Sequence, residues 1–220
     1  MSAKATFRLG DLAATLRELD AASALRVEES GRWFESADRS TRVVVPLVAP
    51  IPAGCRSVDD YLAAVPAVLG RHLVVLMQAG AVALGVFDLG EEVATKSFKR
   101  YVVRGTGRSQ PTHLATKGKS RYGSRLRLQN ATRLLEETNE KLGEWRRHIG
   151  DWETIFVSCP VKLWPTLWEV EPPPPFERER SVVRIPKDLP RPTTDVLLRT
   201  YRGLLWGRIE RSGGRARDGE

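Results

Sequence analysis

Apolar positions along the chain change their spacing several times, and each change marks an expected element. Residues 25–48 alternate between apolar and polar side chains around Gly31 and Asp38, which predicts a hairpin or short meander. Ser57 is followed by Asp60 three residues later, a pattern typical of a helix N-terminus, and Gly70 ends this second helix. A first short helix is expected from leucines at helical spacing: Leu9, Leu12, Leu16 and Leu19.

The middle of the chain predicts a strand meander followed by a long helix. Residues 72–104 are typical of three antiparallel strands, with tight turns at Ala79-Gly80 and Gly90-Glu91. The third strand, Val93 to Arg104, leads into a glycine-rich segment. A long helix is then expected from about Leu126 to Ile149. Its apolar stripe consists of Ala131, Leu134, Leu135, Thr138, Leu142, Trp145 and Ile149.

The last third predicts strands and one more helix. Residues 154–160 have the composition of a buried strand, residues 181–186 of a last strand, and a helix is expected from Thr193 or Thr194 to about Ile209. The order of elements predicts an α/β fold with a mixed sheet and packed helices. We expect residues 1–71 to complete the core of a domain over 72–210, and residues 211–220 to form a disordered tail.

Charge is distributed unevenly along the chain. The net charge is +8, yet no Asp or Glu occurs between Val93 and Leu135, a stretch that contains eleven Lys and Arg. The other residues hold 24 basic and 27 acidic side chains, so the protein is a mildly acidic body with one basic stretch. Clustering of a single sign favours a polyanionic partner, and the low apolar content favours nucleic acid over membrane.

Several kinds of chemistry find little support in the sequence. His72, His113 and His148 stand in no catalytic context, and the two cysteines, Cys55 and Cys159, lie far apart and indicate reduced thiols. No metal-ligand spacing occurs, and we expect no metal and no cofactor. The near-match GTGRSQ to a dinucleotide fingerprint follows a basic strand and lacks the later acid, so it is rejected. Without a membrane-length apolar stretch or a leader, we expect a soluble, cytoplasmic monomer.

The most unusual feature is the basic segment, residues 104–127, with sequence RGTGRSQPTHLATKGKSRYGSRLR. Its glycines permit close backbone approach to a partner, and Gln110 is a neutral amide that can orient a water or a ribose hydroxyl. We expect the stretch from Gly105 to about Ser124 to be mobile in the free protein. The cations predicted to contact phosphates are Arg104, Arg108, Lys117, Lys119, Arg121, Arg125 and Arg127.

The strand meander, the basic segment and the long helix together resemble the middle domain of eukaryotic and archaeal peptide-chain release factors. A closer resemblance is to the Vms-type release-factor-like peptidyl-tRNA hydrolases, especially their short bacterial form. It covers about residues 72–206 and depends on the order of three blocks around Gln110. These blocks are FKRYVVR (98–104), GSRLRLQN (123–130) and VRIPKDLPRPT (183–193).

The resemblance implies a ribonuclease-H-like sheet and places the family's catalytic glutamine at Gln110. The backbone of Gly105, Gly107 and Ser109 would shape the site, although Arg108-Ser109 stands where release factors have two glycines. The implied activity is hydrolysis of the peptidyl-tRNA ester in the ribosomal peptidyl-transferase centre, with the large subunit, its rRNA and peptidyl-tRNA as partners. The segment would supply a positioned water rather than an acid–base pair.

Two other functions stay open from the sequence. A ribosome- or RNA-binding factor without activity could use the basic segment only for docking. A tRNA nuclease would require a general base or metal carboxylates near the segment, and the sequence offers neither.

Overall fold

The computed structural model of the 220-residue chain describes residues 3–100 and 119–212, with side chains in the second range described from residue 125 onward. The chain divides into two compact units, residues 1–69 with 200–220 and residues 70–199.

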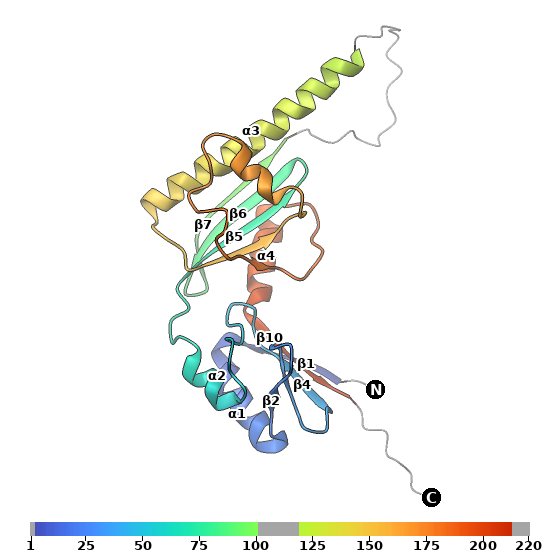
Figure 1. The fold of residues 1–220 in the computed structure, drawn as a ribbon, viewed down its shortest axis with the longest axis vertical. Coiled ribbons are helices and arrows are strands. Elements are labelled where there is room, and N and C mark those ends of the chain that lie inside the picture. The colour runs from blue at the N-terminus through green and yellow to red at the C-terminus, as the bar shows by residue number, and fades with distance from the viewer. Residues whose placement is uncertain (1–2, 101–118, 213–220) are drawn as a thin grey trace, which may run out of the picture. The chain divides into compact units, whose positions relative to one another are not determined.

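The second unit contains a five-stranded mixed sheet (Figure 1). Its strand order is β7-β6-β5-β8-β9; β6 is antiparallel to both of its neighbours, whereas β5, β8 and β9 are parallel. The predicted mixed sheet and its meander are therefore present. The strands are β5 (Arg71–Gln78), β6 (Ala81–Asp88), β7 (Glu91–Lys99), β8 (Thr154–Ser158) and β9 (Val183–Arg184).

The nearly continuous apolar sequences of β5 and β6 reflect a sheet that is covered on both faces. On one face Leu73 and Val75 belong to the core formed with α3 (Lys119–His148). On the other face Gly85 lies so close to α4 (Thr194–Leu204) that an added Cβ would stand 2.8 Å from Leu197. A side chain at position 85 would therefore push α4 away from the sheet.

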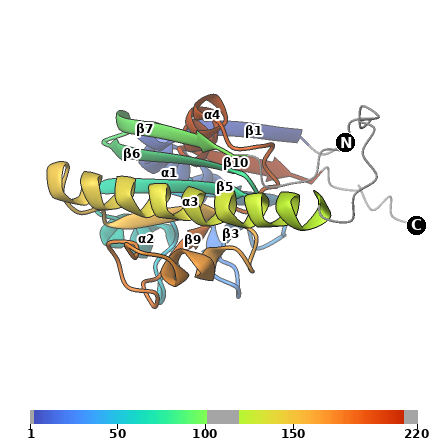
Figure 2. The ribbon, with the colours of Figure 1, turned by 90° about the horizontal axis from the view of Figure 1, so that it is seen from above.

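Helix α3 packs its predicted stripe on the sheet (Figure 2). Leu134, Leu142 and Trp145 are buried there, together with the 3-10 turn Trp164–Glu169. The buried Asn139 donates from Nδ2 to the carbonyl oxygens of Leu167, 2.7 Å away, and Pro172, 2.8 Å away. The helix begins at residue 119 rather than near 126, so residues 119–124 are helical and not part of a loop.

Truncation of this stripe should destabilise the second unit. Leu142 is fully buried, and Leu142→Ala is expected to lower the free energy of opening by about 2–5 kcal/mol. Leu128, on the same helix but 71% exposed, provides the matched control, for which Leu128→Ala should stay within about 0.5 kcal/mol. Hydrogen exchange of the β5 amides measures both values. Equal losses would mean that α3 does not pack as described.

The first unit is built on an antiparallel five-stranded sheet, ordered β1-β10-β4-β3-β2. Helices α1 (Leu12–Ser23, after a 3-10 turn at Leu9–Asp11) and α2 (Val58–Ala64) share one core with it, around Leu16, Phe34 and Tyr61. The strands are β1 (Ala3–Arg8), β2 (Arg26–Val27), β3 (Phe34–Glu35), β4 (Thr41–Val44) and β10 (Trp206–Arg211).

This unit differs from the sequence-based expectation in three ways. Residues 1–69 surround a core of their own instead of completing that of the following domain. Residues 206–209, expected to continue the last helix, belong to β10, because β1 and β4 pair with it on either side. Helix α2 ends at Ala64, since Val65 is extended before Pro66. The Ser57–Asp60 cap is confirmed, with both reciprocal hydrogen bonds present.

Candidate functional site

Most residues of the predicted site lie outside the described part of the chain. Lys119 and Arg121 fall in the first turns of α3, where side chains are not described. Arg125 is exposed and Arg127 is half-buried on the following turns. The expected mobility of the segment concerns residues of which most also lie outside the described ranges. The predicted site residues outside these ranges are Arg104, Gly105, Gly107, Arg108, Ser109, Gln110 and Lys117.

The structure does describe how Arg100, shortly before this segment, is anchored. The backbone N–H of Arg100 donates to the carbonyl of Gly80, 3.0 Å away in the β5–β6 turn. Its guanidinium forms a two-point ion pair with Glu137 of α3, with Nε 3.1 Å from Oε2 and Nη2 paired to Oε1. The hydrogen bonds to Glu137 raise the pKa of Arg100. The last described residue before the predicted site is thus fixed to the sheet and to the helix that follows the site.

The N-terminal half of α3, residues 119–133, extends beyond the sheet (Figure 1). Its sequence holds five Lys and Arg and no acid, and burial begins only at Leu134. The first turn of α3 contains no acidic residue. Cations at a helix N-terminus oppose the macrodipole, so this end of α3 would be stabilised by an anionic partner.

The block that closes the family resemblance, residues 183–193, lies against the same end of the sheet. Gln78, the last residue of β5, donates from Nε2 to the carbonyl oxygen of Leu189 at 2.9 Å. Arg191 donates from Nη2 to the carbonyl oxygen of Gly80 at 3.1 Å. The Gly80 carbonyl therefore joins this closing block to Arg100, the last described residue before the basic segment.

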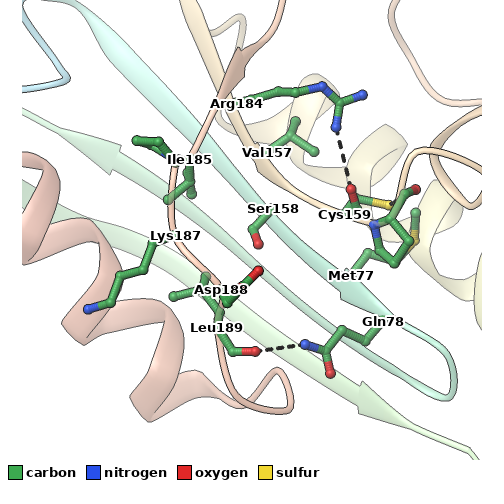
Figure 3. Close-up of a pocket in the computed structure, with 12 residues that line it drawn as sticks. Met77, Gln78, Val157, Ser158, Cys159, Arg184, Ile185, Lys187, Asp188 and Leu189 are labelled. Atoms are coloured by element: carbon green, nitrogen blue, oxygen red, sulfur yellow. Dashed lines mark hydrogen bonds between the residues drawn. The ribbon is translucent and has the colours of Figure 1, made fainter.

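A cavity of about 430 Å³ opens at the carboxyl ends of the parallel strands β5, β8 and β9 (Figure 3). Ser158 and Asp188 lie toward its middle, with Arg184 and Lys187 on either side. The carboxyl ends of parallel strands are where open α/β sheets most often bind ligands. Two cations, one carboxylate and one hydroxyl make this hollow a polar recess beside the closing block.

The comparisons with known proteins now decide the family. The model of the Bacteroidetes VLRF1 release factor family matches residues 72–211, well over half of the chain. The chain belongs to this family. The structure named "Vms1 mitochondrial localization core" is similar to this chain, with a TM-score of 0.51, 11% identity, and coverage of 90% of this chain and 80% of that one. No curated protein sequence matches the chain.

These findings confirm the predicted resemblance to Vms-type release-factor-like proteins. The match to the VLRF1 release factor family begins at His72, in β5, and ends at Arg211, the last residue of β10. It thus includes β10, although this strand pairs within the first unit. The fold likeness to the Vms1 core extends over both of the sheets described above.

Cys159 of this VLRF1-type chain is a poor candidate for a catalytic nucleophile. Burial raises the pKa of the Cys159 thiol to about 12, an effect that the nearby Arg184 only partly opposes. At pH 7 the thiolate fraction is then roughly 10⁻⁵, too small for a nucleophile.

Within the described residues, no group of three or more His, Cys, Asp and Glu could hold a metal ion. No helix of these residues is long and apolar enough to cross a membrane.

The raised pKa predicts an unusual pH dependence for alkylation of Cys159. In a Cys55→Ser variant, the rate with iodoacetamide should rise about tenfold per pH unit from roughly pH 7 to 10, because only the thiolate reacts. A thiol at its ordinary pKa, about 8.5, would instead approach a plateau above roughly pH 9. Mass spectrometry of the Cys159 peptide follows the rate, and such a plateau would contradict the described burial.

Sequence reasoning did not find the anchoring contacts around Gly80 and Glu137. The only local signal was the sign of Arg100 and Glu137, which stand 37 positions apart. Nothing in their spacing indicates that the two pair, since the contact requires β7 and α3 to be placed side by side first.

Proposed function

We propose that the protein is a peptidyl-tRNA hydrolase that acts on ribosomes and releases nascent peptides from stalled ribosomes or large subunits. Membership of the VLRF1 release factor family over residues 72–211 is the observation that carries this proposal. The ribosome, with its rRNA and a bound peptidyl-tRNA, is the partner that a release factor requires. We place this activity in the cytoplasm and assign it to a monomer.

Gln110 is the proposed catalytic residue. In the ribosomal peptidyl-transferase centre the ester is already positioned, so the factor only has to bring a narrow, flexible segment and place a water. The backbone at Gly105, Gly107 and Ser109 would let the segment approach the ester closely. The Gln110 amide would orient the water and stabilise the charge that develops in the transition state. This mechanism needs neither a metal nor an organic cofactor.

Electrostatics supports rRNA as the surface that the segment meets. Arg104, Arg108 and Lys117 in the segment, and four further cations at the start of α3, are accompanied by no carboxylate. Phosphates would neutralise these cations and also the unfavourable positive charge at the N-terminus of α3. The four are Lys119, Arg121, Arg125 and Arg127.

The scaffold supports the same reading. Arg100 is held by the Gly80 carbonyl and by Glu137, so the chain is fixed at the residue after β7, ahead of the segment. We infer that the sheet is of the ribonuclease-H-like type of release-factor middle domains. Numbered by their order in the chain, the strands of this sheet lie side by side in the order 3-2-1-4-5. Among them only strand 2 is antiparallel to the others.

The alternative is a binding factor that docks on rRNA through the same cations without hydrolysis. Two assays separate the two functions: sedimentation with large subunits, and release of labelled peptide from large subunits that carry peptidyl-tRNA. A hydrolase binds large subunits and releases peptide, and Gln110→Ala slows the release strongly while binding stays nearly unchanged. Binding with no release by the wild-type protein would replace the proposal with the binding factor.

A further inference from the structure

The sheet of the first unit has one face that is exposed and carries none of the core side chains. In antiparallel strands, directly opposed residues point to the same side of the sheet. Arg8 opposes Trp206 and Thr6 opposes Arg208, and all four are exposed. The alternate residues, among them Phe7, point to the side on which α1 and α2 pack. Figure 1 shows these two helices together beside β1, β10 and β4.

The exposed side, called the Trp206 face below, is basic and aromatic. Its register pairs extend across all five strands, from Lys4 through Glu210 and Arg42 to Glu35 and Arg26. Among the described residues, the face therefore presents five cations against two carboxylates. Its charged and aromatic residues are Lys4, Arg8, Arg26, Trp33, Glu35, Arg42, Trp206, Arg208 and Glu210.

This excess of cations is specific to the face. Over residues 3–69 and 200–212 the sequence holds eleven Lys and Arg and ten Asp and Glu, so the unit as a whole is nearly neutral. Eight of the ten acids lie away from the face, four of them in α1 and α2: Glu18, Asp20, Asp59 and Asp60. The described residues of this unit that lie off the face therefore carry more acids than bases, six Lys and Arg against eight Asp and Glu.

Flat aromatic and guanidinium groups lie together on the Trp206 face. The guanidinium carbon of Arg8 stands 5.2 Å from the ring centroid of Trp206, which is 40% exposed. The guanidinium of Arg42 stacks over Trp33 with its carbon 3.4 Å from the ring centroid. Arg208 lies on the same strand as Trp206 and opposite Thr6. Bases stack on both kinds of plane, while the same arginines neutralise phosphates.

We propose that the Trp206 face binds single-stranded RNA, with a base stacked on Trp206 and phosphates held by Arg8 and Arg208. The five strands give a platform about 19 Å wide, enough for a short stretch of unpaired nucleotides. A membrane surface is disfavoured because Trp206 is the one large apolar side chain of the described residues that is exposed on this face. This RNA site goes beyond the proposed function, since it does not depend on Gln110.

The test uses the full chain with alanine at Lys117, Lys119, Arg121, Arg125 and Arg127, so that the basic segment contributes little. Binding of a labelled single-stranded RNA of about ten nucleotides is followed by fluorescence anisotropy. Trp206→Ala should weaken binding roughly 5- to 100-fold, whereas Trp206→Phe, which retains a ring, should lose far less. A melting curve of each variant shows that the unit stays folded.

Charge is tested separately by the salt dependence of the same binding. Arg8→Ala/Arg208→Ala should reduce the slope of log affinity against log salt by about 1.4, as expected for two single-strand phosphate contacts. Arg17→Ala/Arg202→Ala removes two exposed charges from α1 and α4 and should leave the slope almost unchanged.

Two results would overturn the proposal. One is wild-type RNA affinity in folded Trp206→Ala. The other is binding of anionic vesicles, but not RNA, through Arg8 and Arg208, which would assign the face to a membrane. Peptide release is measured apart from these assays, so failure of this site leaves the hydrolase proposal standing, and the reverse also holds.

Discussion

Gln110→Ala is expected to slow peptide release by about 10²–10³-fold, on the order of 3–4 kcal/mol, while affinity for the large subunit stays nearly unchanged. The side chain is proposed to act mainly in the transition state, by orienting water and stabilising a developing oxyanion. Much of the remaining acceleration belongs to the ribosome, so the variant should retain a slow reaction. Single-turnover release and sedimentation measure the two quantities independently.

Two further substitutions sharpen this prediction. Gln110→Glu should be at least as damaging as the alanine variant, because a carboxylate would face rRNA phosphates and the oxyanion. Ser109→Gly restores the second glycine of the release-factor motif and should be tolerated, which makes it the matched control for a change within the segment. Wild-type release by Gln110→Ala would show that the catalytic assignment is wrong.

Replacing five basic residues by alanine should produce the second large effect. If Lys117, Lys119, Arg121, Arg125 and Arg127 each contact a phosphate, the slope of log affinity against log salt falls by roughly 4. At about 0.15 M salt this corresponds to a loss of large-subunit affinity on the order of 10³-fold. The measurement is sedimentation or anisotropy across a salt series.

A control with the same loss of charge separates local contacts from net charge. Unchanged affinity in the test variant, or an equal loss in both variants, would remove the assignment of the basic segment to rRNA. The five control cations, all exposed and outside that segment, are Arg17, Lys162, Arg178, Arg199 and Arg202.

Much of the second unit could be predicted from sequence because its signals are local. The stripe from Leu134 to Trp145 repeats often enough to define a helix, and the turns that join β5, β6 and β7 contain glycines. Gly80 and Gly90 both take positive φ, at 79° and 89°. The helix start was predicted too late because residues 119–125 carry cations and glycine rather than apolar side chains at helical spacing.

Long-range pairing explains what the sequence could not predict. Strand β10 contains Trp206 and Ile209 at a spacing that also suits a helix, and only pairing with β1 and β4 selects the strand. Strand β1 itself, Ala3–Arg8, has little apolar signal because one of its faces is exposed. The Trp206 face depends on this register and was equally hidden from sequence reasoning.

The candidate site also combines local features that the sequence shows with long-range contacts that it does not. The composition of the basic segment and the block from 183 to 193 could be recognised along the chain, but the contact that Arg100 and Arg191 share at the Gly80 carbonyl could not. The sheet brings distant parts of the chain together because β5, β7 and β8 run in the same direction, so their carboxyl ends lie at the same end of the sheet.

Ester hydrolysis on the ribosome is best measured with purified large subunits that carry labelled peptidyl-tRNA. We expect the wild-type protein to release the peptide in a single turnover and to leave free peptidyl-tRNA intact, because no ribosome positions the ester there. Release no faster than in buffer, at protein concentrations that saturate the subunits, would show that the protein is not a peptidyl-tRNA hydrolase.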